Sequence, residues 1–255
     1  MTALEQVTPL AARLLAPNPS PMTLDGTNTW ILRSPDAEEC VVVDPGPLDD
    51  GHLDRIVAAG PVALIVLTHG HLDHSEAAPR LAELTGARVV ARDPAWCRNA
   101  PRLEAERAQS VAGVEWLTIL TPGHSSDSVC LLLEPDGVLL TGDTILGRGT
   151  TVVAHPDGRL ADYLDSLQRL RDLAETEVHT LLPGHGPVVE NPLVILDFYL
   201  THRRERLEQV RAAVAAGDTT AAAVVRRVYA DVDPVLWHAA ELSVQAQLDY
   251  LAAGG

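Results

Sequence analysis

Three histidines and an aspartate fall within six residues, His69-Gly70-His71-Leu72-Asp73-His74, immediately after the apolar stretch Val62–Thr68. Neutral imidazole is a preferred zinc ligand, and a neighbouring carboxylate can bind a second ion. In a chain of this composition the pattern would arise by chance on the order of 10⁻³ times, so it is a specific signal. We expect the cluster on a loop between a strand and a helix, where a rigid sheet can make ligands converge.

Three later positions repeat one local arrangement, in which a metal-binding side chain follows a strand and a glycine turn. They are His124 after Pro122-Gly123, Asp143 after Gly142, and His185 after Pro183-Gly184. A single Gly-His pair is typical of an ordinary turn. Three such positions behind the histidine cluster predict instead that all these side chains emerge at one edge of a sheet.

The elements that must position these residues are indicated by apolar runs bounded by Gly, Pro and Asp. Buried strands are predicted at Trp30–Leu32, Cys40–Val43, Val62–Leu67, Arg88–Ala91, Trp116–Leu120, Val129–Leu133, Val138–Leu140 and Val178–Leu182. Helices are predicted at Leu53–Ala59, Glu76–Leu84 and Leu160–Ala174. Strands mixed with helices over this length predict an α/β sandwich whose outer faces are covered by helices.

The chain changes character after Pro192. Three helices are predicted there, over 193–216, 219–229 and 234–252, with starts signalled by proline and aspartate. The net charge is −16 and all positive residues are arginine; residues 1–191 carry a net −14 and residues 192–255 a net −2. We therefore predict two domains, 1–191 and 192–255, with an all-helical C-terminal module.

Composition also bounds the class of protein. Of its residues, 46% are hydrophobic and 21% are charged, which is ordinary for a globular protein. The apolar runs are too short to cross a membrane, and the N-terminus lacks the pattern of a secretory signal. The three cysteines, Cys40, Cys97 and Cys130, are an odd number at wide spacing. We expect free thiols and a cytoplasmic protein.

The order His-x-His-x-Asp-His, Pro-Gly-His, Gly-Asp, Gly-His resembles the metallo-β-lactamase superfamily over about residues 18 to 191. The resemblance implies an αβ/βα sandwich with two divalent metal ions, zinc by preference, at the shared edge of its sheets. The implied ligands are His69, His71 and His124 for one ion, Asp73, His74 and His185 for the second, and Asp143 bridging both. Asp44 matches a supporting position of the superfamily.

Narrower matches point to the lactamase-β-like protein 2 group. They are the segments 18–29 and 142–151 and Tyr199-Leu200-Thr201-His202-Arg203. That group adds a C-terminal winged-helix-like module and includes an endoribonuclease acting on single-stranded RNA, while other relatives are assigned thioesterase work. The present chain departs from it by showing no obvious pair of wing strands after Pro192, which leaves nucleic-acid binding by the module in question.

Seven His and Asp ligands without cysteine favour an open catalytic metal pair over a closed structural site. The implied enzyme is a hydrolase in which a bridging hydroxide attacks the substrate and Asp73 orients the attacking oxygen. Genuine β-lactamase activity is disfavoured, because the export signal is missing and Asp143 stands where the familiar lactamases have cysteine.

Substrate contacts are expected from Arg148, just beyond Asp143, and from His202 and Arg203. Of these, His202 could protonate a leaving group. Two substrates remain open: single-stranded RNA, bound through arginine clusters at 203–211 and 226–227, and a thioester or small ester of the kind that glyoxalase-II-like enzymes hydrolyse. A non-catalytic nucleic-acid-binding regulator is the third and weakest hypothesis. No membrane partner is expected, and the sequence does not define the oligomeric state.

Overall fold

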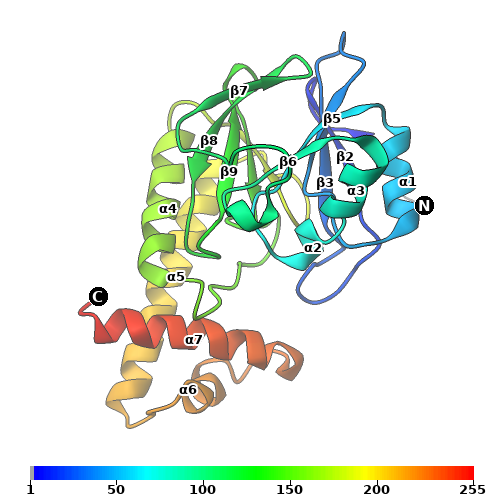
Figure 1. Ribbon diagram of the computed structural model, residues 1–255. Helices are drawn as coiled ribbons and strands as arrows, with labels where there is room; N and C mark the ends of the chain where they lie inside the picture. Colours follow the sequence, from blue (N-terminus) through cyan, green and yellow to red (C-terminus); the bar gives the residue numbers. More distant parts are fainter. Residues whose placement is uncertain (1–2) are drawn as a thin grey trace.

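The computed structural model of the protein describes residues 3–255 and contains two β-sheets packed face to face (Figure 1). The first sheet has the strand order β1 (Glu5–Gln6), β2 (Ala11–Leu15), β3 (Asn28–Leu32), β4 (Cys40–Val43), β5 (Val62–Val66) and β6 (Arg88–Val90). The second has the order β11 (Thr180–Pro183), β10 (Val138–Gly142), β9 (Val129–Leu133), β8 (Val114–Leu120) and β7 (Ala108–Val111). The pairs β4–β5, β5–β6 and β10–β11 are parallel and the others antiparallel.

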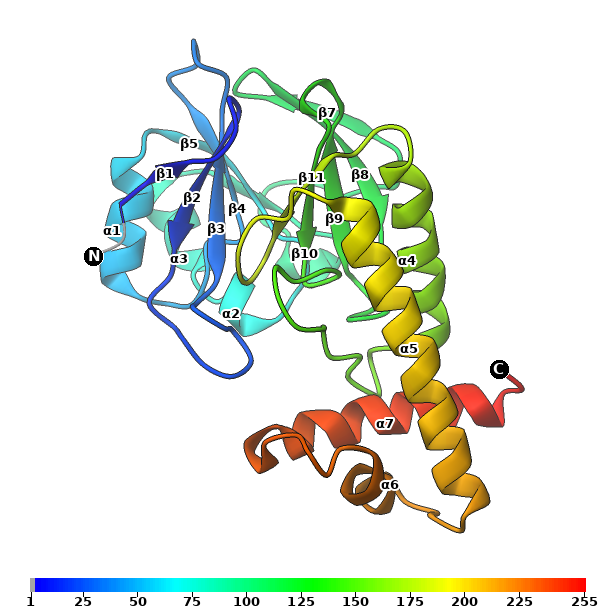
Figure 2. The ribbon, with the colours of Figure 1, turned by 180° about the vertical axis from the view of Figure 1, so that it is seen from behind.

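Helices cover both outer faces of the sandwich. The first sheet is covered by α1 (Asp50–Ala58) and α3 (Ala78–Thr85), and the second by α4 (Leu160–Ala174) and the first half of α5 (Pro192–Ala215) (Figure 2). Short helical turns lie at α2 (Leu72–Ser75), η1 (Pro94–Trp96), η2 (Glu134–Asp136) and η3 (Pro234–Leu236). This arrangement confirms the expected αβ/βα sandwich.

Central strands such as β4 and β9 are apolar throughout because both of their faces are buried. In β9, Val129 and Leu131 point into the core between the sheets, while Cys130 and Leu132 pack beneath α4 and α5. Alternate residues of a strand face opposite sides, so a central strand of a two-sided sandwich has no polar face. The eight predicted strands are confirmed, whereas β1, β2 and β7 were missed. Strands β1 and β7 are only two and four residues long and mostly exposed, so their sequences carry no strong apolar signal.

The chain after Pro192 forms α5, α6 (Ala221–Val228) and α7 (Trp237–Ala252), which confirms the three predicted helices. Thr220 caps α6 by accepting a hydrogen bond from the Ala223 backbone N–H. Among the described residues from 192 onward there is no strand. In both ribbon views α6 and α7 lie beyond the end of the sandwich where α2 is found (Figures 1 and 2).

The first half of α5 is not separate from the sandwich, because Leu196, Tyr199 and Leu200 belong to the same apolar cluster as the outer face of the second sheet. Its second half packs with α6 and α7 in another cluster around Val210 and Val225. The domain boundary at residue 192 therefore stays a prediction. Among residues 3–255, no helix has both the length and the apolar character that crossing a bilayer requires.

One buried histidine lies outside the histidine cluster and fastens α1 to the first sheet. His52 is 0% exposed, and its Nε2 lies 2.8 Å from Thr29 Oγ1, which itself donates to the Asp44 carbonyl. Because that hydroxyl proton is already used, Nε2 must carry a proton, and Nδ1 accepts from Arg55 Nη2 at 3.0 Å. Burial, and then the Arg55 charge, lower the pKa of His52 to about 4.

Cys40 and Cys130 are buried and Cys97 is partly buried, and all three thiols are free, as predicted. Burial raises the pKa of the Cys130 thiol to about 11. A thiol of that kind packs as a small apolar side chain and is a poor nucleophile at neutral pH.

Candidate metal centre

All seven predicted ligands come from four loops at one edge of the two sheets. His69 and His71 follow β5, and the single turn of α2 carries Asp73 and His74. The other three follow β8, β10 and β11, and are His124, Asp143 and His185. Their side chains form three overlapping groups of three residues. Within each group, each residue offers one ligand atom, and these three atoms lie within 4.8 Å of one another.

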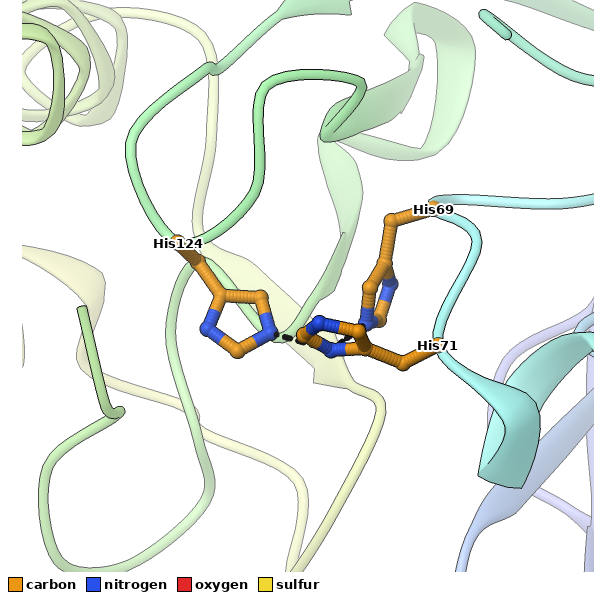
Figure 3. A group of neighbouring side chains, drawn as sticks. All are labelled: His69, His71 and His124. Carbon is orange, nitrogen blue, oxygen red and sulfur yellow. Dashed lines mark hydrogen bonds between the residues drawn. The ribbon is translucent and has the colours of Figure 1, made fainter. Parts of the chain in front are cut away.

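The first group is a triad of histidines, His69, His71 and His124 (Figure 3). Nδ1 of His71 lies 3.0 Å from Nε2 of His69 and 3.0 Å from Nε2 of His124. Two nitrogens bound tetrahedrally to one zinc ion at about 2.0–2.1 Å would lie roughly 3.3 Å apart. Nδ1 of His71 therefore lies near the spacing that ligands of one ion require from both of the other nitrogens.

The second group combines Asp73, His74 and His185. Nε2 of His185 lies 3.1 Å from Asp73 Oδ2 and 3.2 Å from Nε2 of His74. Asp143 stands between the two groups: its carboxylate lies 3.4 Å from Nε2 of both His74 and His185, and 3.8 Å from Nε2 of His124. A carboxylate with neighbours in both groups is placed as a bridging ligand must be.

The far nitrogens of these rings are held by acceptors, which fixes the orientation of each ring. His124 Nδ1 lies 2.6 Å from the Val152 carbonyl, His185 Nδ1 lies 3.1 Å from the Gly26 carbonyl, and His74 Nδ1 lies 2.9 Å from Asp44 Oδ2. A proton on each far nitrogen leaves the lone pair of Nε2 directed into the centre. The imidazoles are thus oriented for a metal.

Asp44 has a second role in the same region. Its carboxylate also accepts from the Thr68 backbone N–H at 2.8 Å and from Thr68 Oγ1 at 2.6 Å, immediately before His69. Asp44 adopts φ 51° and is 1% exposed. Its placement agrees with the predicted supporting role, since it orients His74 and the loop that carries the first ligands.

Electrostatics also suit a cation. Burial lowers the pKa of His69 well below its ordinary value and that of His124 to about 4, so both rings are neutral at pH 7. Burial alone would raise the pKa of Asp143, but the charges of His185 and His74 outweigh it and hold that pKa well below the ordinary value. Oδ1 of Asp143 is nevertheless buried without a hydrogen bond among the described residues. Burial alone would lower the pKa of His74 and His185, but the Asp143 charge outweighs it and raises the pKa of His74 well above its ordinary value and that of His185 to about 9. A metal ion bound there would displace the Nε2 protons of these two rings. Two neutral imidazoles, two displaceable imidazole protons and an ionised carboxylate with one unsatisfied oxygen are a donor set that fits divalent ions.

A cavity of about 360 Å³ opens on the centre and reaches His124 and Asp143. One wall comes from the loops around residues 21–24 and 146–152, and the other from α5, η3 and α7. Apart from the two ligands and three arginines, much of the lining is apolar, including Leu24, Leu146, Val232, Leu236 and Ala239.

The three predicted substrate contacts all border this cavity, and two of them, Arg148 and Arg203, already bind other residues of the chain. Arg148 pairs with Asp25 through two hydrogen bonds of 2.6 and 2.9 Å. Arg203 is only 7% exposed, donates to the Thr151 carbonyl and lies over the Tyr163 ring at 5.0 Å. His202 has a buried Nδ1 without a partner among the described residues, and burial, then Arg203 and Arg206, lower its pKa to about 4. Their predicted contacts with substrate stay predictions.

Sequence reasoning missed the carbonyl oxygens of Gly26 and Val152, because a backbone acceptor leaves no trace in residue type. It identified Gly184 only as part of the turn before His185, and missed how closely the backbone there approaches the other ligands. A Cβ atom there would lie 2.5 Å from Asp143 Oδ1 and 2.7 Å from His74 Cε1. Only glycine lets the β11 loop approach the centre so closely.

Comparison with known proteins agrees with this geometry. The family model described as "Metallo-beta-lactamase superfamily" matches residues 22–185, and that of the "Beta-lactamase associated winged helix domain" matches residues 220–255, where this chain forms helices only.

Similar proteins include two curated relatives. The β-lactamase-like protein 2 homolog of Drosophila melanogaster is 29% identical over 99% of this chain and 91% of its own length. The atrochrysone carboxyl ACP thioesterase of Aspergillus fumigatus is 32% identical over 82% of this chain and 66% of its own length.

Among solved structures, a metallo-β-lactamase family protein from Thermus thermophilus superposes with a TM-score of 0.83 at 24% identity, covering 97% of this chain and 95% of that one. The fold, the ordered His and Asp loops and the family match over residues 22–185 agree. The chain therefore belongs to the metallo-β-lactamase superfamily of metal-dependent hydrolases.

Proposed function

We propose that this protein hydrolyses acyl thioesters at a centre holding two divalent ions, which we take to be zinc. His69, His71 and His124 would hold one ion and Asp73, His74 and His185 the other, with Asp143 bridging them. When bound, such a pair makes water nucleophilic at neutral pH and polarises the oxygen of the bond to be broken.

The observation that carries the thioester proposal is the apolar cavity beside the centre. Its walls at Leu24, Leu146, Val232 and Leu236 suit an acyl chain, because burying apolar surface contributes about 25 cal/mol per Å². Its arginines, by contrast, have internal partners: Arg148 binds Asp25, and the Arg206 guanidinium lies over the Tyr229 ring at 4.5 Å. A phosphate backbone would have to compete with these contacts for the same guanidinium groups.

The state of His202 supports the same substrate class. A pKa of about 4 makes its imidazole neutral at pH 7, and a neutral imidazole is a much weaker acid toward a leaving group than an imidazolium. A thiolate leaves without a proton from an acid, since thiols have a pKa of about 8.5. The alkoxide released from a phosphodiester is far more basic and benefits strongly from an acid. His202 would then orient the substrate, and Asp73, whose carboxylate faces His185, would orient the attacking oxygen.

Two further considerations bear on the choice. The Aspergillus fumigatus relative is named as a thioesterase, which supports this substrate class. Cleavage of single-stranded RNA is the second candidate, and one observation favours it: the Phe198 ring is 48% exposed and stacks on His202 with centroids 5.9 Å apart, a platform on which a base could stack. A cytoplasmic location stays a prediction.

The test compares zinc-loaded protein on acyl thioesters of increasing chain length with the same protein on labelled single-stranded RNA. We expect thioester hydrolysis to exceed RNA cleavage. Ala239→Phe, which fills the cavity wall, should raise KM for long acyl chains more than for acetyl.

Ala252→Phe on the exposed end of α7 is the matched control and should leave KM unchanged for both long acyl chains and acetyl. RNA cleavage that outpaces every thioester would replace the proposal with the nuclease.

A further inference from the structure

The segment from residue 144 to 153 touches the metal centre at both of its ends. It begins directly after Asp143, and near its end the Val152 carbonyl holds His124 Nδ1 at 2.6 Å. Thr151 Oγ1 lies 3.4 Å from the same nitrogen. The segment connects β10 to the region before α4 and extends toward α7 (Figures 1 and 2). Its position therefore controls the orientation of a ligand ring.

Helices α4 and α5 hold the first half of this segment. The Tyr163 hydroxyl donates to the Thr144 carbonyl at 2.7 Å, and the Leu146 backbone N–H donates to the Tyr199 hydroxyl at 3.0 Å. Both tyrosines are 0% exposed. Because they are buried in the apolar cluster of the second sheet, their hydroxyls are fixed points.

The C-terminal helices hold the second half, on either side of Val152. Arg203 of α5 donates to the Thr151 carbonyl, and its guanidinium lies over the Tyr163 ring. Ser243 of α7 accepts from the Val153 backbone N–H at 3.2 Å. Both side chains are 7% exposed, so water does not readily replace either contact.

We propose that Arg203 and Ser243 are positioning residues that hold the Val152 carbonyl against His124, so that the C-terminal helices set the affinity of the three-histidine group for its ion. The inference rests on the proposed metal centre but not on the substrate. Ser243 acts one step further from the ion than Val152 does. Loss of an outer contact typically weakens metal binding by about 10–100-fold, and we expect roughly the lower end, about tenfold.

Ser243→Ala in the full chain is the mildest test. Zinc affinity is measured by competition with a chromophoric chelator, and the ligand field by the visible absorption of the cobalt-substituted protein. We expect one ion to bind about tenfold more weakly and the other to bind as in the wild type, with an altered cobalt spectrum. Ser243→Thr keeps the hydroxyl, and its added methyl borders the cavity, so it should restore both readouts.

Ser110→Ala, on the exposed face of edge strand β7, is the matched control and should change neither readout. Thermal unfolding of the metal-free variants separates lost stability from lost affinity. Unchanged affinities in Ser243→Ala, or equal loss of both ions, would overturn the positioning role, as would a wild type that binds less than one ion. If the wild type and the variants bind metal as expected but the protein hydrolyses no thioester, only the proposed substrate is refuted.

Discussion

Replacing Gly184 by alanine tests the metal centre with a single methyl group. The backbone of Gly184 is not in the left-handed region, so alanine can adopt it without backbone strain. The added Cβ would, however, lie 2.5 Å from Asp143 Oδ1 and 2.7 Å from His74 Cε1, whereas ordinary contact begins at 3.4 Å. Either both ligands must therefore move, Asp143 by about 0.9 Å and His74 by about 0.7 Å, or the β11 loop that carries His185 must shift by a similar distance.

Such a shift is large for a metal site, where ligand distances are held to within about 0.2 Å. A misplacement of about 1 Å commonly reduces catalysis by about 10²-fold. We therefore expect Gly184→Ala to lower kcat/KM by about that factor and to weaken binding of the ion shared by His74 and Asp143. The cost in unfolding free energy should be about 1–3 kcal/mol, as for other overpacked sites.

Metal content after dialysis against a chelator, kcat/KM and thermal unfolding are the measurements. Gly51→Ala is the control, because a Cβ there meets only Asp49 Oδ1 at 3.5 Å and the residue lies inside α1. It should leave metal binding unchanged and stabilise the helix by up to about 1 kcal/mol. If Gly184→Ala still binds two ions tightly, the close approach of the β11 loop to Asp143 and His74 does not determine metal binding.

Two further substitutions test the bridging role of Asp143 and the effect of the buried His52 on stability. Asp143→Ala should release both ions, because its carboxylate faces both groups, whereas His71→Ala should weaken the binding of mainly one ion. Metal analysis of the two variants side by side checks this. If each variant loses a single ion, Asp143 is not a bridge. His52→Gln should make the stability of the fold less sensitive to acid. The pKa of His52 is about 4 in the folded state and about 6.5 in the unfolded state. The neutral ring therefore contributes its full stabilisation above pH 6.5, and this contribution is lost as the pH falls toward 4. The difference in unfolding free energy between wild type and His52→Gln should therefore change by up to about 3 kcal/mol between pH 7 and pH 4 in denaturant titrations, and a constant difference would refute it.

Much of the architecture follows from local sequence. Continuous apolar runs such as Val129–Leu133 indicate a strand buried on both faces, and the spacing of Leu160, Leu164 and Leu167 indicates a helix. These signals depend only on the periodicity of side chains along one element. Likewise, the order of His, Asp and glycine turns along the chain predicted which loops would meet, because each follows a strand of the same sandwich.

Contacts between distant segments were set by the tertiary structure. Arg203 reads as part of a basic surface cluster, yet the docking of α5 on α4 buries it against Tyr163 and Thr151. Arg148 reads as a free loop arginine, yet it meets Asp25, 123 positions away. No local pattern encodes such pairs, because they depend on how separately formed layers pack.

The chemistry of the centre divides in the same way. Residue types alone indicated imidazole and carboxylate ligands for divalent ions. The choice of Nδ1 in His71 but Nε2 in His69 and His124 depends on the backbone path of the β5 loop and on the carbonyl that Val152 presents. The apolar cavity, too, exists only because α5 and α7 close over loops from the sandwich. Sequence determined which groups could bind metal, while packing decided their orientation and what substrate can reach them.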